Sequence, residues 1–566
     1  MQISYYGLHG VIQFSKEEFL IFDQLRKYFS VKGDERDLYK VRAFREGYWD
    51  GREYMIDKQG KFLRGLTNLI VKKIHELGGE VEGTPYNQMW IEVNKPYVHL
   101  ADELDLNGIE LAEHQRRMTR ELLRNGGGTV EGVTGCGKTE SITLLARILS
   151  EYTDTIFFLV HRIGLMRGAM ERVTKRCAEL APYCGLLGDT ERPKEGDRII
   201  FSTMQSLASV MGLGKRRKKD KAMQALYESA GAIIIDEAHR VTGEIYQKIL
   251  AKAPEVPIYQ FTGTPEVDDP IKDWTIVGVG GPIVTRVTRP EMEAIGFIAE
   301  AIACVREFNR RADDPEPGKK RGRRIDWMPK KDTLSYFVSA YAVNPDEGSL
   351  ESTQVKVDHE KGLQPKDDEY YLYPDYGRDI LLIDGQRNAD LVAFVRACLD
   401  QKRNPLILCE RVAQTYYLRG VLSRQNVLPK EKIGLVHGDH STAERKEIVS
   451  GYESGETPIL IASTIFDEGE DIQNVGSVVL ASGGASLVKI VQRIGRGVRA
   501  KDSEMGNYIP IWFPLDALTE FSREHTITRV TYLERSAITI EECTTDWPTF
   551  LNFLRQKYGK NRTRVV

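Results

Sequence analysis

The chain of 566 residues is too long for a single hydrophobic core and predicts three or four domains. Its hydrophobic content of 41% and charged content of 28% are typical of soluble globular proteins and exclude the disordered and fibrous classes. The net charge of -3 carries no global sign of nucleic-acid binding, so any contact with DNA or RNA would depend on locally grouped basic residues.

The N-terminus and the cysteines indicate a compartment. Residues 1–10 lack the charged and apolar regions of a secretory signal, and no apolar run is long enough to span a membrane. The 7 cysteines include no C-x-x-C pair, and the closest two, Cys177 and Cys184, have poor spacing for a metal site. We therefore expect reduced thiols in a cytoplasmic protein.

Residues 1–100 mix amphipathic and alternating patterns and predict a small N-terminal α/β accessory domain. Asp50 and Gly51 indicate a tight turn after Trp49, which would then be a core residue. Basic residues surround this turn and either face phosphates or are solvated: Arg42, Arg45, Arg52, Lys61 and Arg64.

A phosphate-binding loop follows at residues 132–139, which fit G-x-x-x-x-G-K-[ST] without a mismatch. Its glycines let the backbone turn so that successive N–H groups converge on phosphate oxygens. Lys138 would neutralise the β- and γ-phosphates, and the Thr139 hydroxyl would bind Mg²⁺. A short apolar lead-in at 129–130 and a helical pattern at 141–150 give the strand-then-helix context that this loop needs. The residues that we expect around the phosphates are Gly132, Thr134, Gly135, Cys136, Gly137, Lys138 and Thr139.

From residue 101 to residue 295, apolar strands alternate with helical segments, which predicts a parallel sheet covered by helices. The expected strands are residues 155–160, 198–203, 232–236 and 258–263. The third strand ends in Asp236 and Glu237, and ATP hydrolysis needs one carboxylate for Mg²⁺ and one to accept a proton from water. We assign Asp236 to the metal and Glu237 to the proton. A basic run at 214–221 either contacts a nucleic-acid backbone or is a solvated loop.

A second α/β domain is expected over residues 296–535, with strands at 405–410, 433–438, 458–464 and 477–482. An insertion at about 308–376 interrupts it, with charged loops and some strand content at 335–343. This domain has no phosphate-binding loop, but residues 492–499 carry several arginines that can stabilise charge on a γ-phosphate when two domains close. Residues 536–566 are expected to form a short tail with a basic end.

These segments, over roughly residues 105–535, resemble the superfamily 2 helicases. The phosphate-binding loop is similar to motif I, residues 236–239 (Asp-Glu-Ala-His) to the DEAH form of motif II, and residues 261–265 to motif III with glycine in place of alanine. Residues 462–471 resemble motif V, residues 492–499 motif VI, and residues 436–445 the segment that lies along the nucleic-acid backbone. Residues 160–165 lack the usual proline of motif Ia, and His161-Arg162 resembles the branch that contains restriction motors and repair translocases.

The resemblance implies two tandem RecA-like parallel-sheet domains that use ATP and Mg²⁺. It also implies a role for His239, which would form a coupling hydrogen bond rather than bind a metal. Further roles follow by position in the motifs: Gln115 reads adenine, Gly469 and Asp471 contact ribose and the domain interface, Arg496 and Arg499 are arginine fingers, and Gln492 faces water or phosphate.

The N-terminal sequence narrows the expected function. Residues 39–52 and 62–66 resemble the accessory domain of the UvsW helicases of tailed phages. This implies a DNA-binding accessory domain in the host-cell cytoplasm and a branched-DNA substrate: Holliday junctions, stalled forks, displacement loops and RNA–DNA hybrids, in phage recombination, replication and repair, with 3′ to 5′ polarity.

Two alternatives stay open. One is a double-strand DNA translocase subunit of a restriction or defence system, and the absence of a recognisable nuclease pattern of carboxylates and lysine counts against it. The other is a nucleotide-gated annealing or binding protein without unwinding.

Overall fold

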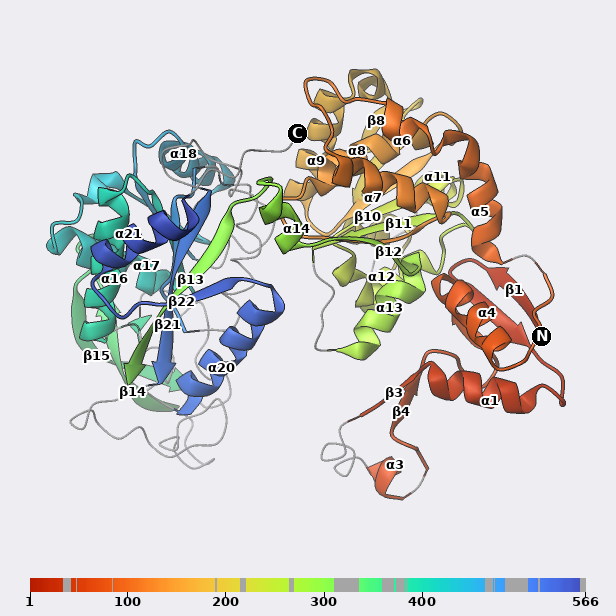
Figure 1. Ribbon diagram of the computed structural model, residues 1–566, viewed down its shortest axis with the longest axis horizontal. Coiled ribbons are helices and arrows are strands. Elements are labelled where there is room, and N and C mark those ends of the chain that lie inside the picture. Colours follow the sequence, from red (N-terminus) through yellow and green to blue (C-terminus); the bar gives the residue numbers. More distant parts are fainter. Residues whose placement is uncertain are drawn as a thin grey trace. The chain divides into compact units, whose positions relative to one another are not determined.

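The computed structural model describes residues 1–33, 42–46, 48–83, 85–188, 191–213, 220–263, 269–309, 335–358, 371–372, 382, 384–463, 472, 474–483, 507–517 and 520–559. The chain forms two compact units, Met1–Thr288 and Arg289–Val566 (Figure 1). Each unit has its own sheet and its own hydrophobic core.

The first unit begins with a small domain built on a three-stranded antiparallel sheet, order β1-β2-β5. Its helix α4 packs on α1, and a short β3–β4 pair extends from it with α3 (Figure 1). Helix α13 of the adjoining domain lies directly against this small domain: the rings of Phe29 and Trp274 are 5.2 Å apart. The elements are β1 (Gln2–Tyr6), β2 (His9–Gln13), α1 (Phe19–Tyr28), β3 (Ser30–Lys32), α3 (Arg42–Arg45), β4 (Arg52–Tyr54), β5 (Lys61–Leu63) and α4 (Thr67–Glu76).

A seven-stranded parallel sheet, order β12-β6-β11-β10-β7-β9-β8, forms the rest of this unit. Its central strands β7, β9 and β11 are mostly apolar and are buried along their whole length, as is typical of strands covered on both faces. The strands are β6 (Gly128–Gly132), β7 (Ile156–Val160), β8 (Cys184–Leu187), β9 (Ile199–Thr203), β10 (Ala232–Asp236), β11 (Ile258–Thr262) and β12 (Ile283–Val287).

Helices cover both faces of this sheet, with α7, α8 and α9 on one side and α12 and α13 on the other (Figure 1). The parallel order requires such crossovers, because each strand must return to the same edge before the next begins. The helices are α5 (Tyr86–Asn94), α6 (Leu100–Glu103), α7 (Glu113–Arg124), α8 (Lys138–Leu149), α9 (Ile163–Arg176), α10 (Met204–Val210), α11 (Lys221–Glu228), α12 (Glu244–Leu250) and α13 (Pro270–Gly280).

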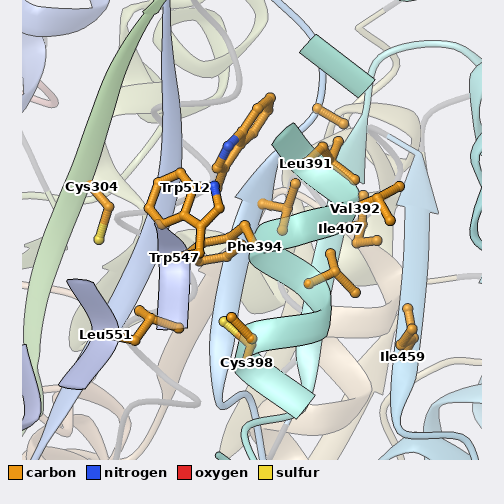
Figure 2. Packing of buried hydrophobic residues seen from close by; sticks show 14 of the residues in the cluster. Cys304, Leu391, Val392, Phe394, Cys398, Ile407, Ile459, Trp512, Trp547 and Leu551 are labelled. Atoms are coloured by element: carbon orange, nitrogen blue, oxygen red, sulfur yellow. The ribbon is translucent and has the colours of Figure 1, made fainter. Parts of the chain in front are cut away.

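The second unit contains another seven-stranded parallel sheet, order β18-β19-β17-β20-β21-β13-β22. One face packs on α16, α17 and α21 in a core that includes Phe394, Trp512 and Trp547 (Figure 2). The other face packs on α18 and α20. The strands are β13 (Glu300–Asn309), β17 (Pro405–Cys409), β18 (Ile433–Val436), β19 (Ile459–Ser463), β20 (Ser477–Leu480), β21 (Tyr508–Ala517) and β22 (Thr539–Glu542). The helices are α14 (Arg289–Ala294), α16 (Gly385–Asp400), α17 (Val412–Arg424), α18 (Thr442–Glu453), α20 (Glu520–Arg535) and α21 (Trp547–Tyr558).

The segment that the sequence suggested as a tail supplies an edge strand and a covering helix of this sheet. Strand β22 pairs with β13, and α21 buries Trp547 in the core. Asp390 holds α21 against the sheet, because its carboxylate accepts hydrogen bonds from the indole nitrogens of Trp512 in β21 at 2.8 Å and Trp547 in α21 at 3.0 Å. The Asp390 carboxylate is largely removed from solvent, and its several donors offset the cost of desolvating it.

The insertion forms a three-stranded antiparallel sheet, order β15-β14-β16, from β14 (Ser335–Val343), β15 (Leu350–Asp358) and β16 (Tyr371–Leu372). Strand β14 coincides with the predicted strand at 335–343. The turn between β14 and β15 docks on α17, where Arg419 and Arg424 donate to backbone carbonyls of the turn. Gly348 and Gly420 allow the two backbones to approach, because a Cβ on Gly348 would lie 2.7 Å from the Gly420 Cα. The charged stretches predicted at 310–324 and 366–369 lie outside the described residues.

The predicted fold class, two tandem RecA-like α/β domains with a small N-terminal domain, is confirmed by these sheets. The proposed domain boundaries stay predictions. None of the helices in the described part of the chain is long and apolar enough to cross a membrane.

Candidate nucleotide-binding site

The phosphate-binding loop connects the end of β6 to the start of α8. Strand β6 ends at Gly132, and α8 begins at Lys138. Gly135 has φ +90° and Gly137 has φ +82°, a left-handed conformation that costs other residues roughly 1–2 kcal/mol. A Cβ on Gly137 would also overlap the side-chain amide of Gln115. The loop therefore needs glycine at position 137 for two independent reasons.

The side chain of Lys138, predicted to bind phosphate, is held by the loop itself. This side chain is buried, and its Nζ donates to the Gly132 carbonyl at 2.8 Å. Thr139 is half-buried in the first turn of α8, where the helix N-terminus presents free N–H groups. A lysine ammonium, a threonine hydroxyl and a glycine-built turn at one helix N-terminus fit a nucleoside triphosphate with Mg²⁺.

Gln115, predicted to read adenine, lies against this loop. It is 4% exposed, and its Oε1 accepts a hydrogen bond from the Ala112 N–H at 3.0 Å. The carbonyl oxygen of the side chain is thus committed to the start of α7, and the amide nitrogen points toward Gly137.

The sequence did not reveal that His114 also supports the loop. His114 is 3% exposed, and its Nε2 lies 2.8 Å from the Cys136 carbonyl oxygen. Burial raises the pKa of the Cys136 thiol, which therefore stays protonated and packs as a small apolar group. The only sequence signal for His114 is its position beside Gln115.

Asp236 ends β10 and Glu237 follows it. Strand β10 lies two strands from β6 in the sheet, with β11 between them. The register places Asp236 level with Phe261 of β11, and Phe261 level with Val130 of β6. Because these strands are parallel, the phosphate-binding loop and the two carboxylates lie at one edge of the sheet.

Glu237 has an unusual backbone. Its φ of +55° and ψ of +52° are left-handed, a conformation that is rare for residues other than glycine and asparagine. Its N–H donates to Asp236 Oδ1 at 2.9 Å, and its Oε2 lies 3.3 Å from His239 Nδ1. Strain at a carboxylate beside a phosphate-binding loop is typical of a residue held for function.

Gly263, the middle residue of the motif III segment and the first residue after β11, lies beside the phosphate-binding loop. A Cβ at this position would lie 3.5 Å from Thr134 Oγ1 and 3.7 Å from Lys138 Nζ. Glycine or alanine fits there, whereas a larger side chain would crowd the lysine. Residues 264 and 265 of this segment lie outside the described residues.

His161, from the segment that resembles motif Ia, has a pKa lowered to about 4, first by burial and then by the nearby charge of Arg240. The charges of Glu237 and His239 also act on it. His161 is therefore neutral at physiological pH and close to the predicted catalytic carboxylate.

In the second unit, His437 lies in the segment expected along the nucleic-acid backbone. It is 2% exposed, its Nε2 lies 2.8 Å from the Tyr416 hydroxyl, and its ring lies 4.0 Å from the His440 ring, tilted by 31°. Burial and the charge of His440 lower its pKa to about 4. Five predicted site residues of this unit lie outside the described residues: Gly469, Asp471, Gln492, Arg496 and Arg499.

The basic residues of the N-terminal domain differ from one another. Arg64 is 1% exposed and donates to the carbonyls of Gly7, Pro254 and Val256, so it neither faces phosphate nor is solvated. Both interpretations of Arg64 were wrong, because its guanidinium donates to three backbone carbonyls that only the fold brings together. Trp49 is half-exposed rather than a core residue. Arg42, Arg45 and Lys61 are exposed, and most of the basic run at 214–221 lies outside the described residues.

Comparisons with known proteins follow the same division of the chain. Residues 108–267 match the family described as type III restriction enzyme, res subunit, and residues 387–501 match the helicase conserved C-terminal domain. A putative helicase of Sulfolobus islandicus filamentous virus is 23% identical over 422 residues, which are 73% of this chain and 66% of that protein. The DNA 3'-5' translocase XPB2 of Sulfurisphaera tokodaii is 25% identical over 398 residues, 70% of this chain and 80% of its own length.

Among solved structures, the crystal structure of T4 UvsW aligns with 96% of this chain and 99% of its own at 17% identity, with a TM-score of 0.39.

Proposed function

The chain belongs to the superfamily 2 helicases and is an ATP-dependent helicase by family, and we propose that it is a DNA motor that remodels branched DNA. The proposed reactions are branch migration of junctions, regression of forks, and unwinding of displacement loops and RNA–DNA hybrids. The proposed setting is phage recombination, replication and repair in the cytoplasm of the host.

One observation carries the proposed ATPase chemistry. The phosphate-binding loop, Gly263 and the Asp236–Glu237 pair follow three adjacent parallel strands, β6, β11 and β10. Ligands of open parallel sheets bind at the carboxyl ends of the strands, so this edge can hold a triphosphate and its water.

Each residue at this edge has a proposed role. Lys138 binds the β- and γ-phosphates, while Thr139 and Asp236 are the metal ligands. Mg²⁺ supplies neutralisation of phosphate charge when it is bound. Glu237 accepts a proton from the attacking water, and Gln115 contacts the base. From the sequence resemblance, Gln492, Arg496 and Arg499 complete the site, and Gly469 and Asp471 contact ribose and the domain interface.

Three considerations support DNA as the nucleic acid along which the proposed motor moves. The relative from Sulfurisphaera tokodaii is named a DNA 3'-5' translocase, which agrees with the polarity that we propose. The N-terminal sequence resembles an accessory domain that binds DNA. Unlike the buried Arg64, three cations of this domain are exposed and can contact phosphates: Arg42, Arg45 and Lys61.

A second candidate function is supported by the match of residues 108–267 to a restriction subunit. In this alternative the chain is a double-strand DNA translocase, and a partner protein cuts the DNA. A nucleotide-gated annealing protein is the third possibility.

Gel assays on a labelled fork, a four-way junction and a linear duplex test the proposal, with ATP and with a non-hydrolysable analogue. Conversion of the fork and junction only with ATP is the expected result. Triplex displacement on linear duplex without junction conversion would favour the restriction translocase. ATP hydrolysis that leaves every substrate unchanged would contradict both motors.

A further inference from the structure

A buried polar cluster lies at the carboxyl ends of β17, β20 and β21 in the second sheet. These three strands are neighbours in the sheet, and each side chain of the cluster is at most 1% exposed. The cluster consists of Arg387 from α16, Gln414 from α17, Ser482 after β20, Asp516 at the end of β21, and Arg529 from α20.

Two of these side chains bind one backbone carbonyl, that of Ala481. Arg387 donates from a terminal guanidinium nitrogen at 2.7 Å, and the Gln414 amide donates at 3.1 Å. The next residue is held from both sides, because the Ser482 hydroxyl donates to Gln414 Oε1 and accepts from the Glu410 N–H at 2.9 Å. The backbone of Ala481 and Ser482 is thus fixed by contacts from α16, α17 and the end of β17.

A single carboxylate balances the two arginines of the cluster. Arg387 Nε lies 2.9 Å from Asp516 Oδ1, and Arg529 donates to Asp516 Oδ2 at 3.2 Å. Burial lowers the pKa of the Arg529 guanidinium, and two of its nitrogens, Nε and one terminal nitrogen, have no hydrogen-bond partner among the described residues. Apolar residues of similar volume would avoid this desolvation cost, so stability alone is a poor explanation for the cluster.

The position of Ala481 and Ser482 in the chain suggests what the cluster is for. One residue after Ser482 the chain enters 484–506, outside the described residues, where the sequence carries Gln492, Arg496 and Arg499. We propose that Arg387, Gln414, Ser482, Asp516 and Arg529 are positioning residues that fix where this arginine segment leaves the sheet. This inference rests on the proposed function, in which the arginines act on the γ-phosphate.

The proposal predicts a specific kinetic signature. An arginine finger acts in the transition state, so a shifted exit point lowers kcat and leaves the KM for ATP nearly unchanged. Gln414→Met removes both amide contacts and keeps the side-chain volume and the apolar packing. We expect kcat to fall about tenfold or more, with the KM for ATP and the DNA affinity within twofold of wild type.

Thr415→Val is the matched control. Thr415 is the next residue of α17 and is fully buried, but within the described part of the chain its hydroxyl bonds only to its own helix, at the Val412 carbonyl, 2.7 Å away. The control should keep the wild-type kcat while it undergoes a similar change in thermal stability. Ser482→Ala, which removes one hydroxyl, replaces Gln414→Met if that variant does not fold. Equal kcat values for Gln414→Met and Thr415→Val would overturn the proposal.

A double-mutant cycle with Arg496→Ala separates this inference from the proposed function. If the cluster acts through the arginine, Gln414→Met should have less than a twofold effect on kcat in the Arg496→Ala background. Multiplied effects would overturn the positioning role and leave the arginine finger in place. An unchanged kcat for Arg496→Ala alone would instead contradict the assignment of the arginine, and with it the proposed closure on ATP.

Discussion

Glu237 combines a strained backbone with a place beside the phosphate-binding loop. Its left-handed φ of +55° directs the carboxylate away from the path that an extended strand would take. The fold keeps this conformation at a side chain that is 20% exposed and lies 3.3 Å from His239.

Replacing Glu237 with Gln should therefore separate ATP binding from ATP hydrolysis. The amide keeps the volume of the side chain but cannot accept the proton, so we expect kcat to fall by at least about 100-fold. Isothermal titration should show an ATP affinity within about threefold of wild type, because Lys138 and the loop are untouched. Turnover at the wild-type rate would remove Glu237 from the role of base.

His437 predicts a pH dependence of stability. Its pKa is lowered from 6.5 to about 4 in the folded protein, where Asp439, His440, Arg419 and Arg445 surround it. The unfolded chain therefore binds a proton first as the pH falls, and the free energy of unfolding decreases between pH 6.5 and pH 4. For this residue alone we expect a loss of about 1–2 kcal/mol at pH 5.

Urea unfolding of wild type and His437→Gln at pH 7, 6 and 5 measures this contribution. Glutamine can keep a hydrogen bond to the Tyr416 hydroxyl but does not titrate, so its stability should fall less steeply with acid. Parallel curves for the two proteins would show that the histidine does not titrate as described.

At the scale of elements, α13 packs between the small N-terminal domain and the sheet that carries the phosphate-binding loop. Gly65 lies so close to the backbone of α13 that a Cβ there would overlap Val277 and Gly281. Arg64, one residue earlier, spans the same junction with three carbonyl contacts and lies over the Tyr86 ring at 4.5 Å. The N-terminal domain is thus packed on the ATP-binding domain rather than tethered to it.

Arg64→Ala should destabilise the first unit by about 2–4 kcal/mol, because it leaves buried carbonyls without donors. Lysine should not restore the loss, since it lacks the planar fork that reaches several acceptors. Arg42→Ala is the control: its side chain is 82% exposed and, among the described residues, bonds to Glu46 alone, so the change should cost less than about 0.5 kcal/mol. Equal denaturation midpoints for the two alanine variants would contradict this account of the junction.

At the scale of the whole molecule, the two units have separate cores, and this predicts that the first can be isolated. A chain of residues 1–288 should fold and bind ATP, because the described phosphate-binding residues lie within it. It should hydrolyse ATP at least about 100-fold more slowly than the full chain, because the proposed arginine fingers are absent. Circular dichroism, ATP titration and steady-state turnover check the three expectations, and full turnover by the isolated unit would show that the arginines are dispensable.

Much of this architecture could be predicted from sequence because its signals are local. The predicted family, the helicase class and the tandem sheets are confirmed, and the expected strand at 232–236 coincides with β10. Apolar runs and a glycine-rich loop predict local structure without reference to distant parts of the chain. The roles of the individual site residues stay predictions.

The features that sequence could not give depend on contacts between distant segments. Arg64 reaches carbonyls at 254 and 256, and β22 pairs with a strand made more than two hundred residues earlier. Nothing in the sequence around His114 indicates that its ring contacts the Cys136 carbonyl, because that contact depends on the fold. These contacts depend on the topology of the fold, which cannot be deduced from a short segment of sequence.

The place of β13 in the second sheet also has a consequence for biosynthesis. This strand lies between β21 and β22, so both of its neighbours are translated long after it: β13 ends at residue 309, and β21 begins at residue 508. At about 5–20 residues per second, the ribosome needs roughly 10–40 s to make the first of them. Throughout that interval a strand whose residues 301–305 are buried in the folded protein lacks both of its sheet neighbours. We therefore expect this strand to be prone to pairing with other unpaired strands during synthesis.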